Sequence, residues 1–191
     1  MANSFQRLKD LLREQGFKIE GHLKTDWQAS SENSRKLIRS DIVTTLPNLS
    51  EQEKENILDL KKRPRSQYWH ISISHTTNVG GWLAVPSTTQ LGFDVELSER
   101  VRERVIERIA RPEEINLCPE PKLLWPAKEA AFKALLNEHQ PTTITKLITA
   151  NWVKLNEDAF QFDCPTIGRG YVCLSDTHFF SAFITNQPVS N

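Results

Sequence analysis

The chain of 191 residues has no excess of charge of either sign and no long hydrophobic run. Lysine and arginine together number 24, as do aspartate and glutamate, so no net charge attracts the protein to nucleic acid or to an anionic membrane. The apolar runs stay well below the roughly 18 residues that a membrane-spanning helix needs. We therefore expect neither a nucleic acid nor a membrane as partner, and any anion site must be local.

Cysteine is scarce, and the N-terminus lacks an uncharged hydrophobic core. Cys118, Cys164 and Cys173 form neither an even set nor a CxxC pair, which argues against a disulfide framework and against a zinc site. Five charged residues between positions 7 and 14 interrupt the apolar pattern that a secretory signal peptide requires. These features predict a cytoplasmic protein.

The hydrophobic pattern predicts helices and strands in alternating blocks. Helical spacing covers residues 4–16, 31–46 and 50–61, with Leu37 in the apolar stripe of the second helix. Three strands of an antiparallel meander are predicted at 68–75, 82–85 and 91–97. Further helices are predicted at 101–110, 112–117 and 122–136, and further strands at 144–147, 152–155, 159–162, 171–174 and 178–184.

This order of elements predicts an α+β fold. Since each half of the chain runs from helices to strands, we expect two similar lobes, residues 1–97 and 98–191. Each lobe would pack helices on a small antiparallel sheet, and a pseudo-twofold axis would relate the two. They would act as one unit, with the active site at their interface.

Two carboxylates stand two positions apart in the predicted strand 91–97. Side chains at the spacing of Asp94 and Glu96 leave a sheet on the same side, where their charges repel each other. Magnesium prefers such hard oxygen ligands and fills its other positions with water and phosphate oxygens. Alone, however, the pair is more typical of a solvated strand face.

Two further segments carry groups that suit phosphate chemistry. Glu129 and Lys133 stand four apart and share one helical face, although alone they suggest an ordinary surface ion pair. Ser74 and His75 end a strand in a turn rich in small residues, where an imidazole and backbone amides could face an anion. A lone histidine in such a place is more often structural, so the combination carries the argument.

In combination, these segments resemble the 4′-phosphopantetheinyl transferase superfamily. The matching motifs are ISHT at 73–76, GFDVE at 92–96 and WPAKEAAFK at 125–133. The length is similar to that of the two-lobed class typified by surfactin synthetase activators. The resemblance implies a monomeric enzyme, a holo-[acyl-carrier-protein] synthase. It would transfer 4′-phosphopantetheine from coenzyme A to a serine of an apo-acyl or peptidyl carrier protein and release 3′,5′-ADP. Fatty-acid, polyketide and nonribosomal peptide synthesis all stay open.

The resemblance assigns the acidic residues to a metal. Asp94, Glu96 and Glu129 match the family's ligands for Mg²⁺, with Mn²⁺ as the alternative ion. Glu114 matches a further acidic residue that some members place near the metal, although its neighbour Glu113 fits as well. Glu129 also matches the residue proposed in that family to help deprotonate the acceptor serine.

The resemblance also implies which residues bind coenzyme A. Lys133 matches the lysine that stabilises the transferring phosphate, so it and Glu129 are the expected catalytic residues. The basic run 61–65 takes the place of a loop that holds the adenine and 3′-phosphate end, with a solvated run of charges as the alternative. The residues expected at coenzyme A are Arg35, Lys36, Arg39, Lys62, Arg63, Ser74, His75, Lys128 and Lys133.

Two positions depart from the family pattern. Ser72 replaces a common asparagine, and Pro126 follows the motif tryptophan. Because proline has no amide donor, the helix that carries Glu129 is expected to begin near Trp125 or to kink there.

Two other functions compete with transfer. A magnesium-dependent nucleotide or pyrophosphate hydrolase would also use clustered carboxylates, but the chain has no Walker loop and no glutamate-rich hydrolase helix. A non-catalytic module that binds coenzyme A or a carrier protein is the other alternative. The retention of three carboxylates and Lys133 argues against it.

Overall fold

The computed structural model describes residues 1–25, 31–136 and 139–185. Within these residues the chain forms two antiparallel sheets with helices packed on them, which confirms the predicted α+β class. None of the described helices is both long enough and apolar enough to cross a bilayer.

The described helices are α1 (Ala2–Glu14), α2 (Glu32–Thr45), α3 (Glu51–Leu58), α4 (Glu103–Ile109), α5 (Pro112–Leu117) and α6 (Leu124–Ala134). Local sequence explains where two of them begin. Ser31 caps α2, because its hydroxyl accepts a hydrogen bond from the Ser34 amide. Ser50 and Glu53 form the expected capping box at the start of α3.

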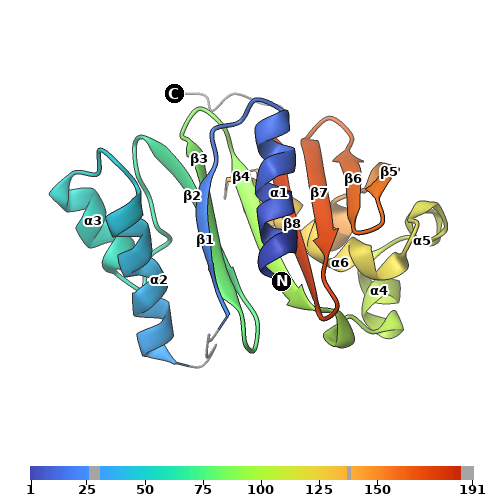
Figure 1. Ribbon diagram of the computed structural model, residues 1–191. Helices are drawn as coiled ribbons and strands as arrows, with labels where there is room; N and C mark the ends of the chain where they lie inside the picture. The colour runs from blue at the N-terminus through green and yellow to red at the C-terminus, as the bar shows by residue number, and fades with distance from the viewer. Residues whose placement is uncertain (26–30, 137–138, 186–191) are drawn as a thin grey trace.

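The strands form a three-stranded and a five-stranded sheet. The first sheet contains β1 (Glu20–Lys24), β3 (Gly80–Pro86) and β2 (Trp69–His75), in that order. The second contains β4 (Leu91–Leu97), β8 (His178–Thr185), β7 (Gly168–Leu174), β6 (Ala159–Cys164) and β5 (Ala150–Asn156), in that order. Figure 1 shows α2 and α3 at one end of the molecule and α4 and α5 at the other.

Several predictions about single elements are wrong. The meander does not form, because β4 does not pair with β3 but pairs antiparallel with β8 in the other sheet. Residues 144–147 were predicted as a strand, but Ile144–Lys146 form a 3-10 helix. Strand β1 was not predicted, since Gly21 is its only buried residue and no alternation marks it. Leu37 is 64% exposed and lies outside the apolar stripe of α2.

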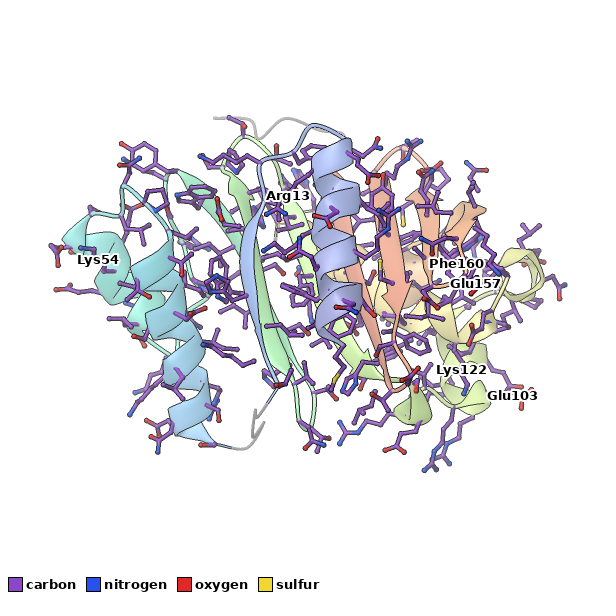
Figure 2. All side chains as sticks on the ribbon, in the orientation of Figure 1. Arg13, Lys54, Glu103, Lys122, Glu157 and Phe160 are labelled. Atoms are coloured by element: carbon purple, nitrogen blue, oxygen red, sulfur yellow. The ribbon has the colours of Figure 1, made fainter. Side chains whose placement is uncertain are left out.

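The hydrophobic core has three parts, each beneath a different layer of helices. One lies between α6 and the five-stranded sheet, and a second lies between α2, α3 and the three-stranded sheet. The third lies beneath α1, which covers residues of both sheets. Charged side chains such as Lys54 on α3 and Glu103 on α4 lie at the two outer ends (Figure 2).

Strand β4 separates two of these layers and aims its acidic residues at α6. Leu91, Phe93 and Val95 pack in the core beneath α1, so the alternate residues face the other way. At Gly92 the backbone of α6 lies directly against the strand. A Cβ there would overlap the Ala130 carbonyl oxygen and lie 2.6 Å from the Ala134 nitrogen. This close approach brings the charged face of α6 to Asp94.

Candidate active site

Side chains from α6, β4 and β2 meet where the two sheets join. The Nζ atom of Lys133 lies 2.7 Å from Oδ1 of Asp94 and also donates to the Ser74 hydroxyl at 3.0 Å. That hydroxyl in turn donates to Oδ1 of Asp94 at 2.9 Å. Asp94 is only 5% exposed, so its charge depends on these donors. The structure thus brings together residues from three separate sequence motifs.

The second carboxylate oxygen of Asp94 has no such donor. Its Oδ2 is buried and has no hydrogen-bond partner within the described part of the chain. A buried acceptor without a partner costs about 1–3 kcal/mol, and more when it carries charge. Native proteins seldom leave such an atom unsatisfied without a ligand, an ion or a water molecule. Oδ2 therefore marks a position where a donor or a cation is stabilising.

Glu129 lies one helical turn before Lys133 and adds a second negative charge. Burial raises the pKa of Glu129, and the carboxylates of Asp94 and Glu96 raise it further, whereas Lys133 opposes the shift. Glu96 is held by the Thr76 hydroxyl at 3.1 Å. One ammonium group therefore faces three carboxylates, which leaves an excess of negative charge.

This excess suits a divalent cation, although no complete metal cage is present. Residues 1–25, 31–136 and 139–185 contain no group of three or more His, Cys, Asp or Glu side chains arranged to hold an ion. Mg²⁺ commonly uses one or two carboxylates, several waters and the phosphates of a substrate. The buried Oδ2 of Asp94, which has no partner among the described residues, and the nearby carboxylate of Glu129 fit an ion bound in that way.

A cleft of about 420 Å³ opens beside Lys133 and collects most of the expected basic residues. Its walls come from α2, β2, α6 and residues 60–64. The charged and titratable residues that line it are Arg35, Arg39, Arg63, His75, Glu129 and Lys133. A larger hollow of about 570 Å³ lies at the far end of α1, and none of the expected site residues lines it. The smaller cleft is therefore the candidate site.

The three arginines give the cleft its positive charge. Arg39 donates to the carbonyl oxygens of Ile57 and Lys62, both at 2.8 Å, which fixes α2 against the following segment. Arg63 donates to the Lys133 carbonyl oxygen at 2.7 Å and so ties residues 60–64 to α6. Arg35, Arg39 and Arg63 form no ion pair with any described carboxylate. An anionic ligand would therefore find cations here that no described carboxylate contacts directly.

His75 lies among these cations at the end of β2. Partial burial lowers the pKa of His75, Lys133 and Arg35 lower it further, and Asp94 opposes them. The imidazole therefore favours its neutral form in the absence of an anion. A bound phosphate would reverse that preference, because its charge stabilises the imidazolium.

Three of the expected basic residues do not line the cleft: Lys36, Lys62 and Lys128. Lys36 is exposed and pairs with Glu32 at 2.7 Å, one turn earlier on α2. Lys62 is exposed and lies 3.4 Å from Asp59. Neither lines the cleft, so the structure separates them from Arg35 and Arg63.

Glu114 and Lys128 form a buried pair of their own. Lys128 Nζ lies 2.9 Å from the Glu114 carboxylate and donates to the carbonyl oxygens of Ile109 and Leu147. Burial alone would raise the pKa of Glu114, but the Thr149 amide and Lys128 lower it. These contacts join α5 and α6 to the segment before β5, and they do not bring either residue to Asp94. Glu113 is exposed.

Two residues of the site, Thr76 and Gln140, were not predicted from the sequence. Thr76 holds Glu96, and Gln140 caps the end of α6 by donating to the Phe132 and Leu135 carbonyl oxygens while lining the cleft. Alternate hydroxyl residues on β2 could have indicated Thr76, but no local pattern marks Gln140. Helix α6 begins at Leu124, so Pro126 lies in its first turn, as expected.

A comparison of the chain with protein-family models finds no match, and a comparison with curated proteins finds none either.

The buried pair predicts a large difference between two lysine substitutions. Lys128→Met should lower the free energy of unfolding by about 3–5 kcal/mol, because it leaves Glu114 buried without its counter-ion. Lys36→Met, which removes an exposed lysine–glutamate pair, should leave the free energy of unfolding close to that of the wild type. Urea denaturation followed by tryptophan fluorescence measures both. Equal losses in the two variants would contradict the structural role of Lys128.

Proposed function

We propose that the chain is a 4′-phosphopantetheinyl transferase, which moves the phosphopantetheine arm of coenzyme A onto a serine of an apo-carrier protein. One observation carries the proposal: a cleft lined by three arginines without carboxylate partners adjoins the paired Asp94 and Lys133. A donor with a 3′-phosphate and a pyrophosphate matches the cations of the cleft. A metal-bound pyrophosphate matches the neighbouring carboxylates.

Each residue has a role in this proposal. Asp94, Glu96 and Glu129 would hold Mg²⁺, which neutralises charge on the pyrophosphate when it is bound. The carrier serine oxygen attacks the β-phosphorus, the bond to 3′,5′-ADP breaks, and the serine proton passes to Glu129. Lys133 pairs with Asp94 and also lines the cleft. It would exchange Asp94 for a phosphate oxygen and stabilise the charge that develops on that oxygen.

The finer points of the architecture belong to the same proposal. We infer two lobes, residues 1–97 and 98–191, related by a pseudo-twofold axis with the active site between them. The candidate site supports an active site between them, because Lys133 of residues 98–191 contacts Ser74 and Asp94 of residues 1–97. We also propose that the enzyme is a cytoplasmic monomer.

A transfer assay tests the function directly. Purified protein with Mg²⁺, coenzyme A and an apo-carrier protein should add one phosphopantetheine per carrier, which intact-mass spectrometry detects. A panel of fatty-acid, polyketide and peptide carriers covers the acceptors that stay open. Release of 3′,5′-ADP without carrier modification would instead identify a pyrophosphate hydrolase. Binding of coenzyme A without turnover would identify a non-catalytic module.

Two neighbouring basic residues test where coenzyme A binds. Arg63→Met should raise the KM for coenzyme A about tenfold or more, because a charged hydrogen bond is worth about 1.5–3 kcal/mol. Lys62→Met, next to it but outside the cleft, should change KM by less than about twofold. Steady-state kinetics at saturating carrier measure both. A larger effect for Lys62 than for Arg63 would contradict the placement of the donor in this cleft.

A further inference from the structure

Three hydroxyl residues follow one another at alternate positions along β2 and just beyond it. Ser72, Ser74 and Thr76 are 5%, 4% and 4% exposed. Alternate residues of an extended chain share a face, and all three hydroxyls form hydrogen bonds to β4. We refer to these three residues as the hydroxyl row.

The hydroxyl row joins the two sheets where they meet. Ser72 accepts a hydrogen bond from the Phe93 amide at 2.8 Å, and Ser74 accepts one from the Val95 amide at 3.2 Å. β2 pairs with β3, and β4 pairs with β8, so these serine hydroxyls take the place of a backbone ladder between the sheets.

Two members of the row also contact the carboxylates of the candidate cation site. Ser74 donates to Oδ1 of Asp94 at 2.9 Å, and Thr76 donates to Oε1 of Glu96 at 3.1 Å. Ser72 accepts a hydrogen bond from an amide of β4 and forms no hydrogen bond to a carboxylate within the described part of the chain. Ser72 and Ser74 are therefore alike in burial and position, but only Ser74 forms a hydrogen bond to a carboxylate.

The hydrogen bonds of Ser74 leave it no spare capacity. A hydroxyl has one proton and two lone pairs. The proton goes to Asp94, and the lone pairs accept from the Val95 amide and from Lys133. Since all three are used, the hydroxyl cannot rotate without losing a bond. Asp94 is then held by Oδ1, which leaves the buried Oδ2 for another ligand.

We propose that Ser74 and Thr76 are positioning residues that orient Asp94 and Glu96 for a divalent cation. This inference rests on the cation site of the proposed function. It gives Ser74 a role different from the contact with coenzyme A that its motif implies. Carboxylates that bind metals are themselves held by hydrogen bonds, and loss of such a bond typically costs 10- to 100-fold in metal affinity.

The two serines provide a matched test. Mn²⁺ binding to the purified protein, measured by electron paramagnetic resonance without coenzyme A and again with it, reads the site without relying on catalysis. Ser74→Ala should weaken Mn²⁺ binding at least about tenfold, whereas Ser72→Ala should stay within about threefold of the wild type. Both variants lose a buried bond to a β4 amide, and Ser74→Ala also loses the bonds to Asp94 and Lys133, so urea denaturation should show the larger loss of stability for Ser74→Ala.

Thr76 provides a second, independent pair of variants. Thr76→Val keeps the shape of the side chain but removes one of two donors to Oε1 of Glu96, the other being the Leu97 amide. It should weaken Mn²⁺ binding about tenfold. Thr76→Ser restores the hydroxyl and should recover most of that loss. A merely structural role would not make recovery depend on the hydroxyl.

The outcomes separate this inference from the proposed function. Equal weakening by Ser72→Ala and Ser74→Ala, or wild-type binding by Thr76→Val, would overturn the positioning role alone. Absence of Mn²⁺ binding by the wild type, with and without coenzyme A, would overturn both. The expected pattern of binding in a protein that modifies no carrier would support the positioning role and count against transfer.

Discussion

The contact of Lys133 with Asp94 and Ser74 is the interaction on which the site depends. It joins α6 to β4 and β4 to β2, and so it fixes both the helix and the junction of the sheets. A buried carboxylate is stable only with such partners. In the absence of a divalent cation, the ammonium group supplies part of the missing charge. Burial raises the pKa of the neighbouring Glu129, and the carboxylates of Asp94 and Glu96 raise it further.

Much of the fold could be predicted because its signals are local. Serine caps mark where α2 and α3 begin, and short runs rich in aromatic and β-branched residues mark most of the strands. The partner of a strand is not a local property. β4 follows β3 closely in the chain but pairs with β8. Its local sequence therefore predicted that it is a strand, but not which sheet it joins. β1 had no alternation to read, because only Gly21 is buried in it.

The candidate site, too, could be predicted only where its signals are local. Periodicity places Asp94 with Glu96 and Glu129 with Lys133, and Gly92 then allows the two pairs to meet. The sequence could not show that Lys128, next to Glu129, turns into the core to meet Glu114, because its other partners are carbonyl groups distant in the chain. Nor could it show that Lys36 and Lys62 point away from the cleft that Arg35 and Arg63 line.

Calorimetric titration of coenzyme A, with and without Mg²⁺, tests most directly whether Asp94 links the cation to the phosphate cleft. For the wild type we expect Mg²⁺ to tighten coenzyme A binding at least about tenfold. Asp94→Asn should remove that gain without lowering the Mg²⁺-free affinity, since the arginines of the cleft are untouched and Lys133 is released from its ion pair. A full Mg²⁺-dependent gain in Asp94→Asn would contradict the account.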